Sequence, residues 1–356
     1  MGKNIIHVIG TGTIGEPLIG LLAVHKADFN IDEVTFHKNM PYSHDRPKLL
    51  QMIAKGANMA TRKDRMAKFE EQGITVAYEQ EEAIARATVV IDCTPSGIGI
   101  DNKNEFYDKY RDKVCGFIAQ GSEFGFGRMY ARGINDEVLD DEDPQFVQVV
   151  SCNTHNLAAL LQTLGDDGAG GLGIEEARFV CLRRANDISQ NSGFVPAPQL
   201  GVHTDPRFGT HHAHDAYHLF KTKGQELNLY SSAVKLNTQY MHAVHFSIRT
   251  KHEIDVDEAL VRLRENKRVA LTEKLSANDI FSFGREHGHY GRILSHTVVP
   301  TPTLAARGNH EIVGSCFTPQ DGNSLLSSIA QTLRWLDRDS LDDRIDCLRP
   351  YLFQEI

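Results

Sequence analysis

The sequence predicts an α/β protein of two domains, in which a parallel sheet is followed by a mostly antiparallel one. In residues 1–150, short apolar runs alternate with helical patterns, which is typical of a parallel sheet with helices on both faces. After residue 150 the pattern changes to that of an α+β domain. The length of 356 residues also suits two domains of roughly 150 residues each.

Six runs in the first half are expected to be strands: residues 4–9, 33–37, 74–78, 88–92, 114–118 and 146–150. Between several of them lie amphipathic stretches that predict helices, for example 14–24 and 47–58. The acidic stretch 135–144 ends in proline, and we expect it to be a solvated loop that leads into the last strand.

The second half contains further strand-like runs at 177–184, 231–236, 242–249, 295–300 and 311–317. Helical patterns occupy 153–164, 256–265 and 322–337, and they predict helices that back the sheet. We therefore expect a first domain at 1–150 and a second at 151–323. The final helix, 324–350, is expected to return and pack on the first domain.

Composition excludes several classes of protein. The chain is 41% hydrophobic and 24% charged, as ordinary globular proteins are, and its net charge of −9 does not favour nucleic acid or an anionic membrane as a partner. No stretch reaches the roughly 18 apolar residues of a membrane span, and the N-terminus resembles no signal peptide. Six cysteines lie without CxxC spacing, which argues against a disulfide framework or a zinc knuckle. A cytoplasmic protein with free thiols is expected.

A glycine motif follows the first predicted strand. Gly10, Gly12 and Gly15 form GxGxxG, with Thr13 and Ile14 inside it, and a helical pattern comes next. In this context the first glycine permits the turn, the second lets the backbone approach a pyrophosphate, and the third lets helix and strand pack closely. The alternative is a turn whose glycines serve packing alone. We predict a Rossmann-type domain that binds a nicotinamide dinucleotide.

The second strand indicates which dinucleotide is bound. It ends in His37, Lys38 and Asn39, without the carboxylate that usually holds the ribose of NAD. Lys38 suits the 2′-phosphate of NADP instead, so the sequence favours NADP slightly over NAD, although Lys38 could equally be a solvated surface lysine. The loop after 88–92, with Thr94, Pro95 and Gly97, and the turn at Gly121 are further candidate cofactor contacts.

Cys152 is the candidate nucleophile. It follows the strand at 146–150 and opens the helical pattern at 153–164. A cysteine at a helix N-terminus lies in a positive field that favours the thiolate, and the backbone N–H groups of the first turn can stabilise an oxyanion. We expect the other five cysteines to be ordinary thiols.

An ordered set of motifs resembles glyceraldehyde-3-phosphate dehydrogenase of the archaeal (type II) kind. The matching segments run from residue 8 to about 330, and the order and spacing are similar. They are Thr13-Ile14-Gly15, Asp92-Cys93-Thr94-Pro95-Ser96-Gly97, Ser151-Cys152-Asn153-Thr154, Arg183-Arg184-Ala185-Asn186-Asp187, His211-His212-Ala213 and Tyr240-Met241-His242.

The resemblance implies a thioester mechanism. Cys152 would attack the aldehyde, and His242 would take a proton as hydride leaves for the nicotinamide. Inorganic phosphate would then release 1,3-bisphosphoglycerate. The residues that would hold substrate or phosphate are Ser151, Asn153, Thr154, Arg183, Arg184, His211 and His212, with Arg184 also able to contact the cofactor. A homotetramer is implied by the resemblance alone.

The chain departs from the family pattern in the loops 165–173 and 279–292 and, closer to the expected site, at two further places. His155 replaces a threonine that helps to hold phosphate, and Gly314-Ser315-Cys316-Phe317 replaces a His-Gln-Glu-Ser segment. Asn323 matches a family asparagine and is expected to contact the cofactor. A different phosphorylated or carboxylated aldehyde, or a catalytically silent dinucleotide-binding regulator, is therefore an alternative. The histidines at 211, 212, 214 and 218 raise the possibility of a metal, but no further ligand lies at motif spacing, so none is expected.

Overall fold

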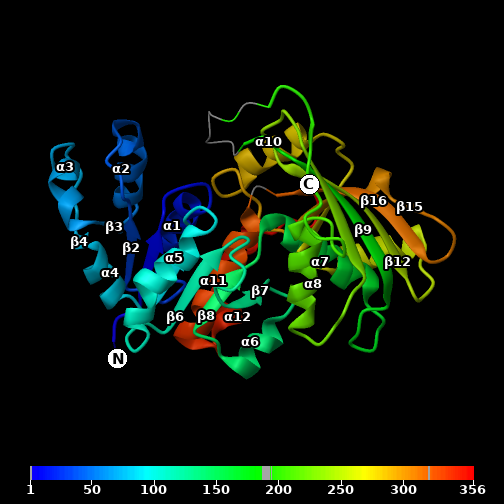
Figure 1. Cartoon of the computed structure of the whole chain (residues 1–356), viewed down its shortest axis with the longest axis horizontal. Helices are drawn as coiled ribbons and strands as arrows, with labels where there is room; N and C mark the ends of the chain where they lie inside the picture. Colours follow the sequence, from blue (N-terminus) through cyan, green and yellow to red (C-terminus); the bar gives the residue numbers. More distant parts are fainter. Residues whose placement is uncertain (1, 187–192, 194, 320) are drawn as a thin grey trace. The chain divides into compact units, whose positions relative to one another are not determined.

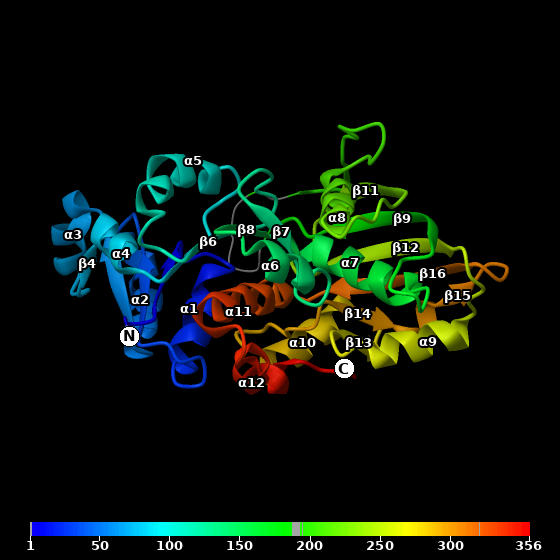
Figure 2. The same ribbon diagram turned by 90° about the horizontal axis from the view of Figure 1, so that it is seen from below.

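A computed structural model describes residues 2–186, 193, 195–319 and 321–356, and it divides into two compact units. The first contains residues 2–128, 142–149 and 325–348, and the second contains 129–141, 150–324 and 349–356. Each unit has its own sheet, which Figures 1 and 2 show from two directions. Among the described residues, no helix is both long and apolar enough to span a membrane.

The first sheet has the strand order β4-β3-β2-β1-β5-β6-β8-β7, and every pairing from β4 to β8 is parallel. This arrangement confirms the predicted Rossmann-type sheet. Its strands are β1 (Ile5–Ile9), β2 (Glu33–His37), β3 (Ala57–Thr61), β4 (Tyr78–Glu79), β5 (Val89–Asp92), β6 (Gly116–Gln120), β7 (Arg128–Tyr130) and β8 (Phe146–Val149).

Helices follow most of these strands, because a parallel pair needs a crossover connection. At the other end of the chain, α11 packs closely on β6, where a Cβ atom added to Gly116 would lie 2.4 Å from the Trp335 ring. The helices are α1 (Gly15–Val24), α2 (Arg46–Ala54), α3 (Met66–Glu70), α4 (Gln80–Arg86), α5 (Ile98–Glu105), α11 (Gly322–Asp337) and α12 (Leu341–Ile345). The 3₁₀ helices are η1 (Ser43–Asp45), η2 (Lys63–Arg65), η3 (Tyr107–Tyr110) and η5 (Asp346–Tyr351).

The second sheet has the order β10-β11-β9-β12-β16-β14-β13, and β15 also pairs with β16. Five of its seven pairings are antiparallel, so the prediction of a mostly antiparallel sheet is confirmed. The strands are β9 (Ile174–Arg183), β10 (Gln199–Leu200), β11 (Leu229–Lys235), β12 (His242–Thr250), β13 (Val269–Thr272), β14 (Thr297–Pro300), β15 (Ala305–Ala306) and β16 (Glu311–Thr318).

Three helices pack on one face of this sheet and enclose an apolar core (Figure 2). They are α7 (Cys152–Gly165), α8 (His211–Lys221) and α9 (Val256–Glu265). On β12 the side chains alternate between buried and exposed, as expected for a strand with one covered face. The remaining helical elements are α6 (Asp136–Glu142), α10 (Ala277–His287) and η4 (Thr301–Thr303).

Three local predictions are wrong. The run at 74–78 forms only the short β4, because the N–H of Ile74 bonds back to the Phe69 carbonyl at the end of α3, while the missed β3 supplies the neighbouring strand. The acidic stretch at 135–144 contains α6, whose Val138 and Leu139 are buried. The expected helix at 324–350 is interrupted after Asp337, where the N–H of Leu341 bonds to the Arg338 carbonyl.

The glycines between β1 and α1 differ sharply in the space around them. Gly10 has φ 96°, in the region that favours glycine, and a Cβ atom on Gly15 would lie 2.0 Å from the carbonyl oxygen of Gly10. A Cβ atom on Gly12 would meet nothing within 4 Å. Gly10 and Gly15 therefore serve the fold, whereas the space beside Gly12 is open.

We expect Gly15→Ala to lower the free energy of unfolding by about 1–3 kcal/mol, because the added methyl group has no room beside a backbone carbonyl. Gly12→Ala is the matched control and should change stability by less than about 0.5 kcal/mol. Thermal unfolding of the two variants and the parent tests this pair. Equal melting temperatures for all three proteins would show that helix and strand do not need a glycine at position 15.

A candidate active site around Cys152

Cys152 is the first residue of α7, directly after β8 and Ser151. Ser151 is the N-cap, and its side-chain oxygen accepts a hydrogen bond from the backbone N–H of Thr154 at 3.3 Å. The hydroxyl groups of the same two residues lie 2.9 Å apart. Thr154 is fully buried, so Ser151 and Thr154 form a helix cap here. Cys152 lies half-buried beside this cap.

Asp321 is the charged group next to the Cys152 thiol, and sequence reasoning missed it. Its carboxylate lies close enough to the thiol for each group to shift the pKa of the other. It also forms an ion pair with Arg184 at 3.0 Å, in which the two side chains are only 9% and 10% exposed. Asp321 has φ 62°, a left-handed conformation that costs of order 1 kcal/mol and that the surrounding contacts must hold.

These neighbours decide the protonation state of Cys152. Burial raises the pKa of the thiol well above its ordinary value, the charge of Asp321 raises it further, and Arg184 opposes them. Burial also disfavours ionised Asp321, but Arg184 and Arg292 outweigh that effect and lower the pKa of its carboxyl group. The resting pair is thus a neutral thiol beside a carboxylate, not the thiolate that the helix N-terminus alone would favour.

His242 begins β12 and is fixed by the same arginine. Its Nδ1 atom accepts a hydrogen bond from the backbone N–H of Arg184 at 3.0 Å. Burial, and then the charge of Arg184, lower the pKa of His242 to about 3, so the ring is neutral and carries its proton on Nε2. His245, three positions along the strand, is exposed and contacts Ser315 instead.

Two of the expected phosphate ligands belong to a buried hydrogen-bond network. The Asn153 amide donates to Nε2 of His212 at 3.2 Å and accepts from the Thr318 hydroxyl at 3.0 Å. The other ring nitrogen of His212 lies 3.0 Å from the Thr210 hydroxyl. Burial lowers the pKa of His212 well below its ordinary value, so this ring is neutral. Asn153 and His212 therefore join the starts of α7 and α8.

Arg183 and His211 remain exposed at the end of β9 and the start of α8. Arg183 lies within electrostatic reach of three histidines, because its charge lowers the pKa of His211, His212 and His242 after burial has done so. The structure thus brings Cys152, Arg184, His242, Asn153, His212, Arg183 and His211 into one region of the second unit. Asp187, the last residue of the arginine motif, lies outside the described residues.

Asn323 and His155 contact the backbone carbonyls of Cys152 and of the preceding Ser151, respectively. The Asn323 amide donates to the carbonyl of Cys152 at 3.0 Å and to that of His296 at 3.1 Å, and it accepts from the N–H of Ser324 at 2.8 Å. His155 is fully buried, its Nδ1 lies 3.0 Å from the Ser151 carbonyl, and burial lowers its pKa to about 4. A neutral, enclosed His155 is unsuited to hold phosphate as a cation.

The glycine motif of the first unit fits a pyrophosphate. No side chain caps the start of α1, whose N-terminus attracts an anion, and the space beside Gly12 lets a ligand approach the backbone. Glu33, the first residue of β2, cannot reach such a ligand, because it lies at the opposite end of that strand from the glycine turn. Its carboxylate binds Asn58, Tyr78 and Arg86 there.

Cations surround the end of β2. Lys38 pairs with Asp45 at 2.5 Å, and the neighbouring Asn39 is exposed. Lys48, which sequence reasoning missed, binds Asp45 at 3.1 Å and the carbonyl of Thr11 in the glycine turn at 3.0 Å. Burial, and then nearby Arg62 and Lys38, lower the pKa of His37 to about 4.

The loop after β5 is held by acidic side chains. Thr94 bonds through its backbone N–H and its hydroxyl to Asp92, and Pro95 follows it. Buried Glu123 accepts from the N–H groups of Gly97 and Ile100 at the start of α5. Because a protein carboxylate occupies this helix N-terminus, the loop is unsuited to bind a further anion there. Gly121, with φ 83°, bonds to the Val149 carbonyl at 2.9 Å.

The histidines of α8 do not converge on a common point. The rings of His214 and His218 lie 4.4 Å apart between centroids, and His214 bonds to Asp215 at 3.1 Å. In the part of the chain that the structure describes, these histidines form no group of three converging ligand atoms. The six cysteines, all of them described, are free thiols.

Comparison with known proteins gives the family. Glyceraldehyde-3-phosphate dehydrogenase of Methanococcoides burtonii is 31% identical over 274 residues, which is 76% of this chain and 74% of the relative. The enzymes of that name from Sulfolobus acidocaldarius and Methanobacterium bryantii are 27% and 31% identical, over 87% and 58% of this chain and over 85% and 58% of their own lengths. A comparison with protein-family profiles finds no match. The chain belongs to the glyceraldehyde-3-phosphate dehydrogenase family, in a divergent archaeal-type form.

We expect Asp321→Asn to make Cys152 more reactive towards iodoacetamide at neutral pH. Loss of the carboxylate removes a charge that raises the thiol pKa, so the pH midpoint of alkylation should move down. The measurement is the rate of Cys152 labelling against pH, read by mass spectrometry, with Asp257→Asn on the exposed side of α9 as the control. A midpoint that stays in place or moves up would mean that Asp321 does not govern the thiol.

Proposed function

We propose that this protein catalyses the reversible phosphorylating oxidation of glyceraldehyde 3-phosphate to 1,3-bisphosphoglycerate, with NADP or NAD as hydride acceptor. The observation that carries the proposal is the cluster of Cys152, Arg184, His242 and Asp321 at the start of α7. Membership of the family supports it, as does the glycine turn of the first unit.

The first step is attack by the Cys152 sulfur on the aldehyde carbon. The thiol proton passes to Asp321, the carboxylate beside it. The carbonyl oxygen becomes an alkoxide, which the N–H groups of Cys152 and Asn153 stabilise together with the Nε2–H of His242. The bound nicotinamide supplies the hydride acceptor. Once the hydride has left the carbon, the C=O bond re-forms and a thioester remains on Cys152.

This route modifies the role first expected for His242. A ring that accepts the Arg184 N–H at Nδ1 holds its proton on Nε2, so it acts as a hydrogen-bond donor to the alkoxide. The alkoxide has no hydroxyl proton to lose, so hydride transfer needs no further base. Removal of a hydroxyl proton by His242 would require the ring to give up its contact with the Arg184 N–H or to change tautomer.

The second step is attack by inorganic phosphate on the thioester. A phosphate oxygen bonds to the acyl carbon, the Cys152 sulfur leaves, and the acyl phosphate is released. Exposed Arg183 and His211 are the residues that we propose to hold phosphate groups, since a guanidinium fork matches phosphate geometry. Arg184 joins them if a phosphate displaces Asp321 from its ion pair. The buried Asn153 and His212 support these ligands through their hydrogen-bond network, and Thr154 supports them through the cap of α7.

Spectrophotometric assay of the reduced cofactor tests the function directly. With glyceraldehyde 3-phosphate, phosphate and either cofactor, the parent protein should turn over, and Cys152→Ser should lose at least roughly a thousandfold of kcat/KM. If the protein turns over another phosphorylated or carboxylated aldehyde but not glyceraldehyde 3-phosphate, the proposed substrate is wrong and the thioester mechanism stands. No turnover with any aldehyde while the cofactor still binds would favour a silent dinucleotide-binding regulator.

The preference for NADP has its own test. Lys38→Gln removes the charge without adding a second carboxylate beside Asp45, and we expect it to raise the Kd of NADP by about tenfold or more and to change that of NAD by less than twofold. Lys68→Gln, on the exposed side of α3, is the control. Equal losses for both cofactors on titration calorimetry would show that Lys38 does not meet a 2′-phosphate. The homotetramer and the cytoplasmic location remain predictions from the sequence.

A further inference from the structure

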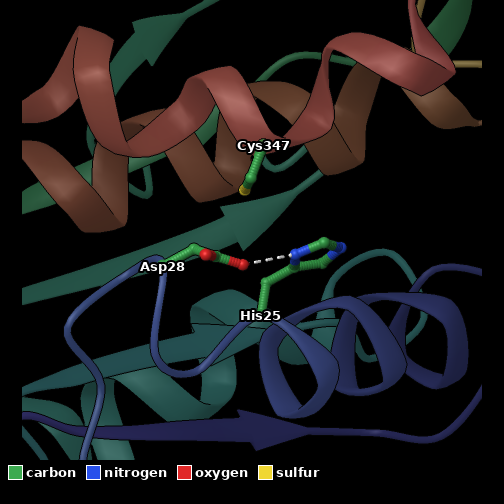
Figure 3. Close-up of side chains that lie close together, drawn as sticks. All are labelled: His25, Asp28 and Cys347. Carbon is green, nitrogen blue, oxygen red and sulfur yellow. Dashed lines mark hydrogen bonds and ion pairs between the residues drawn. The ribbon is translucent and has the colours of Figure 1, made fainter.

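Three side chains that no step above uses point towards one another in the first unit (Figure 3). His25 is the C-cap residue of α1, Asp28 lies three residues later, and Cys347 lies in η5. Their potential ligand atoms, one from each residue, all lie within 4.8 Å of one another. In the described part of the chain, no other group of three or more His, Cys, Asp or Glu side chains converges in this way.

The spacing of these atoms is close to that of a metal shell. Zinc binds nitrogen at about 2.0–2.1 Å and sulfur at about 2.3 Å, so the ligand atoms of a tetrahedral site lie roughly 3–4 Å apart. Here the Nδ1 of His25 is 2.9 Å from the Oδ2 of Asp28, and the Cys347 sulfur faces this pair in Figure 3. The three ligand atoms are therefore already close to the separation that a single ion requires.

The electrostatic surroundings favour a cation. Asp28 and Asp346 place two carboxylates close to the Cys347 thiol, and negative charge of this kind attracts a divalent ion. Arg344, three residues before Cys347, directs its guanidinium to Ser340 at 2.7 Å, to Asp337 at 3.8 Å and to the Asp28 backbone carbonyl at 3.4 Å.

Exposure also matches an open coordination site. The His25 side chain is 16% exposed and Cys347 is half-buried, whereas the Asp28 side chain is 52% exposed. Two ligands thus lie against the protein while the third faces solvent, which leaves access for the ion and room for a water molecule as the fourth ligand.

We propose that His25, Asp28 and Cys347 form a binding site for a zinc-type divalent cation, completed by water. The ion replaces the contact between His25 and Asp28 and the proton of the Cys347 thiol, so binding releases protons. It joins the segment after α1 to η5 near the end of the chain. The site shares no residue with the candidate active site or the glycine turn, so it stands or falls independently of the proposed reaction.

Cobalt titration of the chelator-treated, full-length protein tests the site. Co²⁺ should give one equivalent of a thiolate-to-cobalt charge-transfer band with the visible bands of tetrahedral Co²⁺, and Zn²⁺ should displace it. Cys347→Ser should lose the charge-transfer band. His25→Ala and Asp28→Asn should keep the fold by circular dichroism and weaken Zn²⁺ binding at least roughly tenfold.

Two cysteine variants serve as controls. Cys115→Ser removes an exposed thiol of the same unit, and Cys152→Ser removes the candidate nucleophile, and both should keep the full cobalt spectrum. Zn²⁺ should raise the melting temperature of the parent and both controls but not that of Cys347→Ser, because a ligand stabilises only a fold that binds it. The proposal is overturned if the parent gives no charge-transfer band, if Cys347→Ser keeps it, or if Cys152→Ser loses it.

Discussion

The ion pair between Arg184 and Asp321 is the interaction on which the candidate active site depends. It joins the segment after β9 to the segment before α11. Each partner also acts on a second group, since the Arg184 N–H orients His242 and the Asp321 carboxylate raises the pKa of the Cys152 thiol. Both charges are nearly buried, so removal of one partner would leave the other without compensation, at a cost of about 3–5 kcal/mol. The positions of nucleophile, histidine and arginine are therefore coupled, and a substitution at one of them changes the chemistry of the others.

The first unit depends on a steric constraint. The contact of Gly15 with the Gly10 carbonyl lets α1 start immediately after β1, and the carboxyl ends of the adjacent strands β1, β2 and β5 then place three loops at one edge of the sheet. The loop after β1 contains the open backbone at Gly12. The segment after β2 contains the cations that pair with Asp45, and the loop after β5 is held by Glu123. Because each loop is held by contacts within the protein, this edge is organised before any ligand binds.

The sequence predicted what periodicity and local motifs encode. Both sheet types, most of the strands and the start of α7 follow from apolar patterns and from GxGxxG in its strand–helix context. It missed β3, where the weakly patterned Ala57–Thr61 segment becomes a strand only because β2 and β4 pair with it. It missed Asp321, Lys48 and Glu123 for a related reason, since their roles come from contacts across long sequence separations. The sequence showed His155 as a departure from the family pattern, but only its burial beside His296 in the structure indicates that it serves packing.

The neutral thiol of Cys152 has a consequence for survival of the protein under oxidative stress. Peroxides attack thiolates, so a cysteine that a neighbouring carboxylate keeps protonated is oxidised slowly to sulfenic acid and, beyond that, to forms that cannot be reduced back. If substrate phosphate draws Arg184 away from Asp321, the pKa of the carboxyl group rises, so Asp321 becomes a stronger base for the thiol proton only when substrate is bound. The same pair of side chains would then protect the resting protein from inactivation and restrict its reactivity to turnover.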